Sequence, residues 1–401
     1  MEHPTLFDMT PSSRELLQQL WSGSDIPLVR GAVFDEDPGP LQLADLKTDE
    51  RIEGMLLGIA VGDSLGHSTE WQFDPETRHK EFGTIVDHVP DRQGRLGRIS
   101  DDTQMSFWTV ERLVARGHFD FDDLVSCFVN RRNKIVGRGK NTSAALERHA
   151  QRLRHATPTL AECVGNVNEE GRGNGGLMRL APIVLPHLRR PSAALWSDAV
   201  LATFITHGNP IALAASVGFI DLLWQVLQMP TGVAPEPLWW IDRYVQITRD
   251  LDVNPLPYPL NTDPVPKWFS DFRGTLGEFI DGPVRDAFSK GIPLRDACSL
   301  DGFGSRADCV QTVPACLYVL MCHADSIASA IIAAVNDTKD NDTVAAIVGA
   351  ILGALHGKQS IRRKWIDGIG SSVLEIPGYQ GQRDHDVIIS MANQAAREFL
   401  R

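Results

Sequence analysis

The segment from Arg51 to Asp63 constrains the fold more than any other part of this 401-residue chain. Its apolar side chains recur at helical spacing, and small residues, including Gly54, Gly58 and Gly62, interrupt them at regular intervals. Small side chains on a helix let a second helix approach closely. We therefore predict a helix here that packs tightly against other helices.

Helical periodicity continues through most of the sequence, whereas few runs alternate with a period of two. The further segments predicted to be helical are 105–114, 121–131, 144–152, 193–205, 211–227, 307–322, 327–335, 343–355 and 387–400. A proline-rich stretch at 229–267 is expected to be a long loop or helix-flanking excursion. The chain is thus predicted to be all-α, with one compact multi-helix domain over residues 49–401.

Residues 1–48 differ from the rest, with scattered prolines and an acidic run at 35–37. One short amphipathic helix is expected from Ser13 to Trp21, with Ser12 or Ser13 as its cap. Two interpretations of this N-terminal arm remain open. It lies on the surface of a partner, or it is a tail packed on its own domain.

Composition excludes several classes of function. The formal net charge of −12 opposes general nucleic-acid binding, because an acidic surface repels phosphates. The six cysteines form no C-x-x-C pair and are expected to be reduced core residues. The N-terminus does not resemble a signal peptide, and the longest apolar stretch, around 344–355, is too short for a membrane span. A cytoplasmic location without membrane or nucleic-acid contact is expected.

Two acidic clusters carry most of the chemical information. The first comprises Ser100, Asp101, Asp102 and Thr103, and taken alone it is most simply a surface helix cap with acidic first-turn residues. The second comprises Asp340, Asn341, Asp342 and Thr343, and it opens an Ala/Gly/Ile/Val helix that suits deep burial. Carboxylates are rarely buried unless they are paired or bound to metal. Together the clusters favour a shared site for hard divalent cations such as Mg²⁺ or Mn²⁺, with oxygen ligands that do not suit zinc.

Glycine-bearing loops accompany these clusters. The stretch 62–66 closes the first helix and leads to Glu70, and the stretch 171–179 is rich in glycine. Backbone N–H groups in such loops can wrap a phosphate or a sugar hydroxyl, although turn formation is their default role. Neither loop matches a P-loop or a dinucleotide-binding fingerprint. His207 lies between two predicted helices beside Gly208, where a structural histidine is the commoner case.

Five motifs in this order resemble the ADP-ribosylglycohydrolases of the dinitrogenase-reductase-activating type. The resemblance spans roughly residues 50–360. It rests on 62–66 with Glu70, on 100–105, on 173–179, on 206–207, and on 340–343 with the helix that follows.

The resemblance implies an all-α domain with a binuclear Mg²⁺ or Mn²⁺ centre in a cleft. The implied metal ligands are Ser100, Asp101, Asp102, Asp340, Asp342 and Thr343. Glu70 would be the acidic residue near the scissile bond, with Asp101 as a second candidate for proton transfer. The diphosphate and ribose would be bound by Asn174, Gly175, Gly176 and His207, with Gly139 in a further glycine-bearing loop at 137–142.

The implied reaction is hydrolysis of the bond between ribose C1″ and a modified protein side chain, through an oxocarbenium-like transition state. The sequence departs from the family pattern in two places. Ser100 stands where many relatives have Thr, and Thr338-Lys339 stands where relatives often have Gly-Gly. The hydroxyl is retained in the first case. In the second case, Lys339 would add a positive charge near the substrate.

Other functions remain open. The N-terminal arm could occupy the active site of an ADP-ribosyltransferase, as in an immunity protein that blocks its partner by contact. A structural protein that has lost catalysis is another alternative, which the intact carboxylate clusters oppose. A different two-metal hydrolase is a third. The sequence leaves open whether the modified group is arginine, serine, a nucleobase or a free metabolite.

Overall fold

The computed structural model of the chain describes residues 12–42, 48–155, 159–164 and 169–400. Over these residues the secondary structure is helical, apart from one isolated bridge between Gly173 and Asp308. The all-α prediction is therefore confirmed. The helices are α1 Ser13–Ser22, α2 Thr48–Gly66, α3 Pro75–Phe82, α4 Asp101–Arg116, α5 Phe121–Arg131, α6 Lys140–His155, α7 Leu160–Val164, α8 Ala194–Phe204, α9 Pro210–Gln228, α10 Trp239–Thr248, α11 Leu276–Phe279, α12 Arg285–Ser289, α13 Leu294–Ala297, α14 Cys309–His323, α15 Ile327–Asp337, α16 Asn341–His356, α17 Arg363–Asp367 and α18 Asp384–Leu400.

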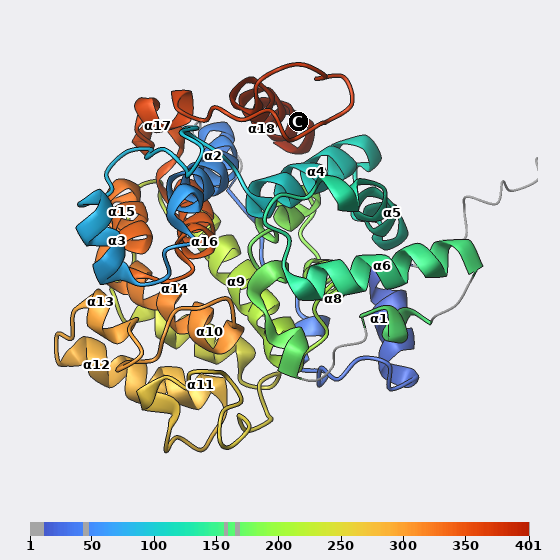
Figure 1. The fold of residues 1–401 in the computed structure, drawn as a ribbon. Coiled ribbons are helices and arrows are strands. Elements are labelled where there is room, and N and C mark those ends of the chain that lie inside the picture. The colour runs from blue at the N-terminus through green and yellow to red at the C-terminus, as the bar shows by residue number, and fades with distance from the viewer. Residues whose placement is uncertain (1–11, 43–47, 156–158, 165–168, 401) are drawn as a thin grey trace, which may run out of the picture.

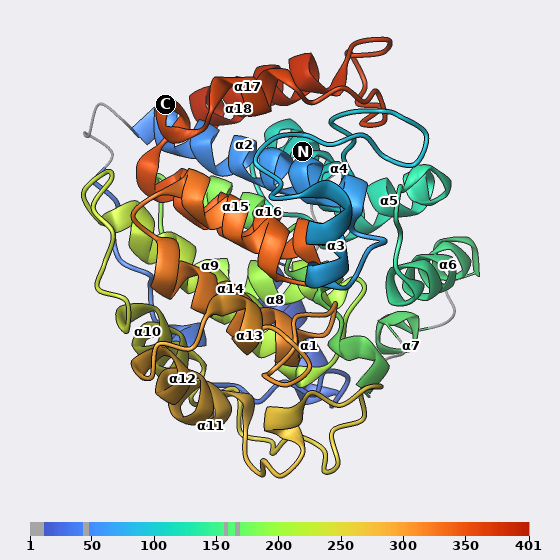
Figure 2. The ribbon, with the colours of Figure 1, turned by 60° about the vertical axis from the view of Figure 1, so that its left-hand side comes forward.

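The centre of the fold is the close pairing of α2 with α16. A Cβ atom on Gly58 would lie 2.0 Å from the carbonyl oxygen of Gly349. One on Gly62 would lie 2.2 Å from the carbonyl oxygen of Ala345. The backbones touch where side chains would otherwise separate them, so the small residues set both the spacing and the register of the two helices. Figure 2 shows the pair in the interior, with α17 and α18 on one side and α15 on the other.

Arg51 ties the start of α2 to two neighbouring helices. Its buried guanidinium donates to the carbonyl oxygen of Ala354 at the end of α16 (2.6 Å) and to that of Met229 after α9 (3.0 Å). A cation suits this position because the last carbonyls of a helix have no partner within the helix and carry partial negative charge. The result is a fixed junction of α2, α9 and α16.

Helix α9 crosses the core among α8, α10, α14 and α16 (Figure 1). It is long and apolar enough to cross a membrane by length and composition alone, but 89% of its most apolar stretch is buried inside the fold. The apolar run at 344–355 lies in the shorter helix α16. The core accounts for the composition of α9.

The helix predictions agree with the structure to within a few residues at most ends. The proline-rich stretch is the main difference, because it contains α10 rather than only a loop. Trp240 of this helix is buried, and its ring packs edge-on against Trp239 with centroids 5.1 Å apart. Tertiary burial of these aromatic side chains outweighs the helix-breaking effect of the flanking prolines.

The described part of the N-terminal arm, residues 12–42, packs on the chain's own domain. Trp196 Nε1 at the start of α8 donates to the carbonyl oxygen of Glu36 (2.8 Å), and Trp224 Nε1 on α9 donates to that of Gly39 (3.1 Å). Leu17 and Phe34 of the arm are buried in the same core as α8 and α9. Of the two interpretations of the arm, these residues fit the packed tail. Residues 1–11 and 43–47 lie outside the described part.

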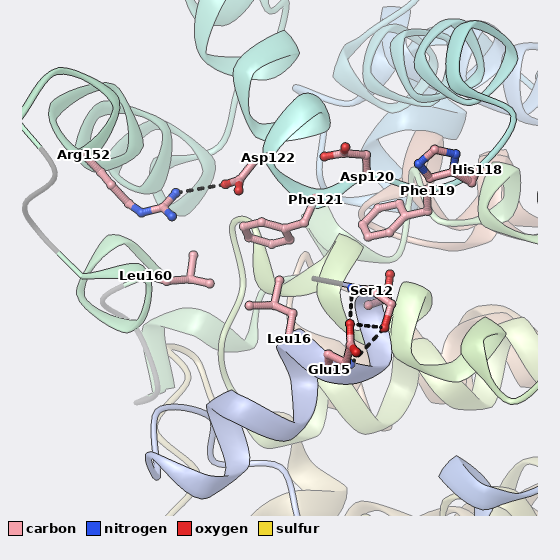
Figure 3. Close-up of a pocket in the computed structure, with 11 residues that line it drawn as sticks. Ser12, Glu15, Leu16, His118, Phe119, Asp120, Phe121, Asp122, Arg152 and Leu160 are labelled. Carbon is pink, nitrogen blue, oxygen red and sulfur yellow. Dashed lines mark hydrogen bonds and ion pairs between the residues drawn. The ribbon is translucent and has the colours of Figure 1, made fainter. Parts of the chain in front are cut away.

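Helix α1 leaves a hollow of about 360 Å³ where it meets α5, α6 and α7 (Figure 3). Leu16, Phe121 and Leu160 converge in this hollow, and an ion pair between Asp122 and Arg152 (3.2 Å) lies at its edge. None of its lining residues belongs to the two acidic clusters. The hollow is therefore separate from the site described next.

Candidate active site

The antiparallel pairing of α2 with α16 places the end of one helix beside the start of the other. Asp63, in the last turn of α2, accepts hydrogen bonds from the backbone N–H of Ser100 (2.9 Å) and that of Thr103 (3.1 Å). The Thr103 hydroxyl donates to the same carboxylate. Asp63 thus holds the N-terminus of α4 against α2. Asp63 lies within the motif at 62–66, and no role for it was predicted.

The first acidic cluster opens α4. Ser100 is the N-cap and its Oγ accepts from the backbone N–H of Asp102 (3.1 Å), while its hydroxyl lies 3.0 Å from Asp102 Oδ2, to which it can donate. Asp102 Oδ1 is buried and has no hydrogen-bond partner among the described residues. Asp101 and Asp102 both line the cleft, whereas Ser100 does not. The predicted ligand Ser100 is therefore turned toward Asp102 rather than toward the cleft.

The second acidic cluster opens α16. Asp340 occupies the N-cap position without making a side-chain cap, so its carboxylate is available to the cleft, where Asn174 Nδ2 donates to it (2.5 Å). Asn341 points the other way and binds the end of α2 through the carbonyl oxygen of Gly66 (3.3 Å). Asp342 Oδ1 accepts from the backbone N–H of Thr343 (2.9 Å). Asp340 and Asp342 therefore line the cleft, while Asn341 between them anchors the start of α16 to the end of α2.

The two clusters meet in one cleft of about 360 Å³. Its lining includes ten of the residues singled out from the sequence: Glu70, Asp101, Asp102, Gly139, Asn174, Gly175, His207, Asp340, Asp342 and Thr343. Oxygen atoms of Glu70, Asp340 and Asp342 lie within 4.8 Å of one another. Residues as far apart in sequence as Glu70 and Thr343 therefore share one site.

Two of the proposed site residues do not line the cleft. Ser100 is one, as described above, and Gly176 is the other. A Cβ atom on Gly176 would lie 2.6 Å from Thr203 Cγ2, so this glycine allows its loop to pack on α8. Lys339 does not line the cleft either. Its backbone N–H donates to Ser305 Oγ (2.9 Å), and the expectation of an added charge in the pocket is not met by the lining residues.

The carboxylates of the cleft repel one another strongly. Burial, followed by the charges of Asp342, Glu70 and Asp63, raises the pKa of Asp101 to about 8. Burial and neighbouring carboxylates also raise the pKa values of Asp102, Asp340 and Asp342. Such a concentration of buried negative charge is costly unless a cation compensates it.

The donor set fits hard divalent cations. The groups that converge are carboxylates and a threonine hydroxyl, with no thiolate, and Asp102 Oδ1 is a buried oxygen that lacks a partner within the described protein. Sites in which oxygen donors predominate suit Mg²⁺ or Mn²⁺ rather than zinc. A buried acidic site with room for a metal ion is thus consistent with the residues present.

His67 belongs to the site, although the sequence analysis did not identify it. Its Nδ1 lies 3.3 Å from Glu70 Oε2 and 3.6 Å from Asp342 Oδ2, and its ligand atoms also group with those of Asp63. Burial alone would lower its pKa, but hydrogen bonds to Asp342 and Glu70 raise it to about 11. The imidazolium partly compensates the carboxylates. The signal in the sequence was its position one residue after Gly66 and three before Glu70.

Glycine-bearing loops form a further wall of the cleft, next to the carboxylates: Asn174 Nδ2 donates to Asp340 (2.5 Å), and a Cβ atom on Gly137 would lie 3.2 Å from Asp101 Oδ1. Arg172 binds Asp308 at the start of α14 (2.7 Å) and so fixes the approach to Gly173 and Asn174. A Cβ atom on Gly175 would lie 2.8 Å from Cε1 of His207, so the loop passes directly against that ring. Gly139, by contrast, faces open space just before α6 begins. This wall offers backbone N–H groups and a helix N-terminus, which suit an anionic or hydroxylated ligand.

Comparison with known proteins agrees with this architecture. The family model described as ADP-ribosylglycohydrolase matches residues 44–400. The chain is 27% identical over 341 residues to the ADP-ribosylarginine hydrolase Tri1 of Pseudomonas putida, covering 80% of this chain and 75% of that protein. It is 25% identical to the ADP-ribosyl-[dinitrogen reductase] glycohydrolase of Rhodospirillum rubrum, covering 81% of this chain and 92% of that protein.

A vertebrate relative and a solved structure extend the comparison. The ADP-ribosylhydrolase ARH3 of Danio rerio is 25% identical, with 79% of this chain and 85% of that protein covered. The solved structure titled ADP-ribosylglycohydrolase-related protein complex superposes with a TM-score of 0.61 at 23% identity, covering 88% of this chain and 99% of that one. At this identity the superposition shows the fold.

Proposed function

The chain belongs to the ADP-ribosylglycohydrolase family, and from this premise we propose that it is a metal-dependent hydrolase that removes ADP-ribose from modified proteins. The observation that carries the proposal is the meeting of two buried carboxylate clusters and Glu70 in one cleft that glycine-bearing loops also line. Acidic oxygens next to glycine-bearing loops, whose backbone N–H groups can bind anions, suit a ligand that carries a diphosphate and ribose hydroxyls.

Two divalent cations, Mg²⁺ or Mn²⁺, would be held by the oxygen donors of both clusters. The proposed ligands are Ser100, Asp101, Asp102, Asp340, Asp342 and Thr343. Ser100 would have to release Asp102 Oδ2 to serve as a ligand, because its hydroxyl now lies within hydrogen-bond distance of that atom. Bound cations would supply Lewis-acid charge next to the ribose and lower the pKa of a water molecule.

Glu70 is proposed to move the proton. Its side chain is about one-third exposed, so it borders both the carboxylates and the open end of the cleft. In the reaction, water adds to ribose C1″ while the bond from C1″ to the protein side chain breaks. The water proton goes to a carboxylate and is passed on from there to the leaving group. Glu70 is the first candidate for this base and Asp101 the second.

The nucleotide is proposed to lie along the loop wall. Asn174 is held in place by its bonds to Asp340 (2.5 Å) and to Thr312 Oγ1 (3.0 Å). Gly139 and Gly175 line the cleft and carry no side chain of their own, and the first residues of α6 line the cleft beside them. Partial positive charge at that N-terminus would favour a diphosphate.

The test is release of free ADP-ribose from proteins modified on arginine or on serine, with magnesium and with a chelator. We expect release with magnesium and none with the chelator, and the preferred substrate identifies the linkage. Asp101→Ala and Asp342→Ala should abolish turnover while the protein stays folded by circular dichroism. Equal release by the chelated enzyme, or wild-type turnover by either variant, would refute the metal assignment.

A further inference from the structure

A chain of three buried side chains leads from the core to the cleft through Arg179, Thr206 and His207. Arg179 Nη2 donates to Thr206 Oγ1 (2.8 Å), and Thr206 Oγ1 lies 2.8 Å from His207 Nδ1. Arg179 Nε also donates to the carbonyl oxygen of Gly175 (3.1 Å), and its guanidinium stacks 4.9 Å from the ring centre of Phe128. The guanidinium is therefore held rigidly, and the threonine hydroxyl lies between two fixed partners.

The hydrogen bonds of Thr206 indicate where the proton on His207 resides. Arginine can only donate, so Thr206 Oγ1 is an acceptor toward Arg179. Among the described residues, the only acceptor for the Thr206 hydroxyl proton is His207 Nδ1. A proton on Nδ1 would place two donors on one oxygen and leave the hydroxyl proton buried without a partner, which is unfavourable. Nδ1 is therefore the acceptor, and the ring proton lies on Nε2.

Protonation of both ring nitrogens is disfavoured at this position. Burial, and then the charge of Arg179, lowers the pKa of His207 to about 3. An imidazolium would also require Nδ1 to donate toward a hydroxyl that Arg179 already approaches as a donor. The ring is neutral across the range of pH in which the protein would work.

His207 Nε2 lies beside Gly173 and Gly175 in the lining of the cleft. A Cβ atom on Gly173 would lie 3.1 Å from His207 Nε2, so glycine at this position keeps the space in front of the nitrogen open. His207, Gly173 and Gly175 all line the cleft. No described residue accepts a hydrogen bond from Nε2. A buried donor that opens onto a cleft in this way is suited to an oxygen atom of a ligand.

We propose that Arg179 and Thr206 are positioning residues that hold His207 as a neutral Nε2–H donor, and that this donor binds an oxygen atom of the nucleotide sugar. The identity of the ligand rests on the proposed function, whereas the positions of the protons on Thr206 and His207 do not depend on it. His207 is thereby a binding group and not the acid or base of the reaction, because a nitrogen fixed as N–H by its partners has no free lone pair at the cleft.

The first experiment needs no substrate. The full chain, labelled with ¹⁵N at histidine, is examined by long-range ¹H–¹⁵N correlation, and the His207 signals are assigned by their loss in His207→Gln. We expect a protonated Nε2 and an unprotonated Nδ1, unchanged from about pH 5 to about pH 8. A proton on Nδ1, or titration of His207 within that range, would overturn the proposal.

The second experiment measures ADP-ribose binding by calorimetry with magnesium. Thr206→Val removes the hydroxyl and should weaken binding roughly tenfold, the size expected for one misplaced hydrogen bond. The spectrum of Thr206→Val should also lose the Nε2–H signal of His207. Thr206→Ser, which keeps the hydroxyl, should restore both the binding of ADP-ribose and this signal. Thr203→Val is the matched control, because Thr203 is a buried threonine at the end of α8 whose hydroxyl has no partner among the described residues.

The outcomes separate the two ideas. If Thr206→Val binds like the wild type, or if Thr206→Ser fails to restore the Nε2–H signal, the positioning role is refuted. If the wild type binds no ADP-ribose at all, the proposed function and the assigned ligand of Nε2–H are refuted, while the spectrum still decides between the two tautomers.

Discussion

A Cβ atom placed on Gly66 would lie 2.5 Å from Cα of Asp342. The end of α2 therefore touches the first turn of α16 with no side chain between them. Asp63 in the same turn of α2 anchors α4 through the backbone N–H of Ser100 (2.9 Å). Through these two contacts, one helix end brings both acidic clusters to the cleft.

The glycines of α2 should be essential for stability. Gly58→Ala would place a methyl group 2.0 Å from the carbonyl oxygen of Gly349. Because this oxygen belongs to the backbone, the clash can be relieved only if α2 and α16 move apart. We expect the free energy of unfolding to fall by about 1–3 kcal/mol or more, as for other overpacked cores. Urea unfolding followed by circular dichroism measures this change.

Gly282→Ala is the matched control, because a Cβ atom there meets nothing within 4 Å. Its unfolding free energy should be unchanged or slightly raised, since alanine restricts the unfolded chain. Equal loss of stability in the two variants would contradict the proposed close packing of α2 on α16.

Asp102→Asn should abolish the increase in melting temperature that magnesium causes. Burial, and then the charges of neighbouring carboxylates, raise the pKa of Asp102. A neutral amide at this position avoids both costs in the metal-free protein. We expect the melting temperature in chelator at pH 8 to be unchanged or raised, and the increase on adding magnesium to be lost.

Asp325→Asn serves as the comparison, because Asp325 is exposed and lies outside the cleft. It should melt like the wild type both with and without magnesium. If Asp102→Asn kept the full magnesium response, Asp102 would not be a ligand.

The stabilisation by magnesium should increase with pH. In the metal-free protein the pKa of Asp101 is raised from 3.8 to about 8, so the folded state binds more protons than the unfolded state between these values. Stability of the metal-free fold therefore decreases as pH rises through this interval. A bound cation favours the charged carboxylates and removes the decrease.

We expect the difference in melting temperature between magnesium and chelator to grow from about pH 5 to about pH 8. The difference cancels contributions from groups away from the cleft, including the buried His88 and His149, whose pKa values burial lowers to about 4. A difference that is constant with pH would show that the carboxylates are not the magnesium site.

Glu70→Gln should separate catalysis from binding. Removing the carboxylate that accepts the proton should lower kcat by roughly 10²- to 10⁴-fold, the usual contribution of general acid–base catalysis. KM should change little, because the loop wall and not Glu70 is proposed to bind the nucleotide. Steady-state release of ADP-ribose provides both constants.

Glu76→Gln on α3 is the control, since Glu76 is exposed and lies outside the cleft. Its kcat should equal that of the wild type. Loss of kcat in both variants would point to a general charge effect, and full activity of Glu70→Gln would transfer the role of base to Asp101.

The N-terminal arm should contribute to folding rather than to catalysis. Phe34 is buried, packs edge-on against Trp21 with centroids 4.9 Å apart, and does not line the cleft. Phe34→Ala should lower the free energy of unfolding by about 3–5 kcal/mol and leave kcat of the folded protein unchanged. Urea unfolding and the hydrolysis assay measure the two quantities.

Arg14→Ala provides the comparison for the arm, because Arg14 is exposed and its ion pair with Asp35 is long (3.6 Å). Its effect on stability should stay within about 0.5 kcal/mol. If removal of residues 1–42 left stability unchanged but abolished binding to an ADP-ribosyltransferase, the arm would instead be a partner-binding segment.

Much of this protein could be predicted locally. Apolar spacing placed α5 and α9 to within a residue or two, because the side chains that face the core repeat with the helix itself. The first acidic cluster was recognised as a helix start, because Ser100 caps α4 through a contact within one turn. In each case the deciding interactions lie within a few residues of one another.

The remaining features depend on contacts between residues far apart in the chain. Periodicity did not show that α10 lies within a proline-rich stretch, where burial of Trp240 stabilises it. Nor did it assign a role to His67, whose pKa is raised most by Asp342, 275 positions later in the chain. The spacing of apolar residues in the sequence shows which face of each helix is buried. Which buried faces pack together depends on how closely the two helix backbones can approach. In this protein the glycines of α2 allow that approach at the turn where the carboxylates lie.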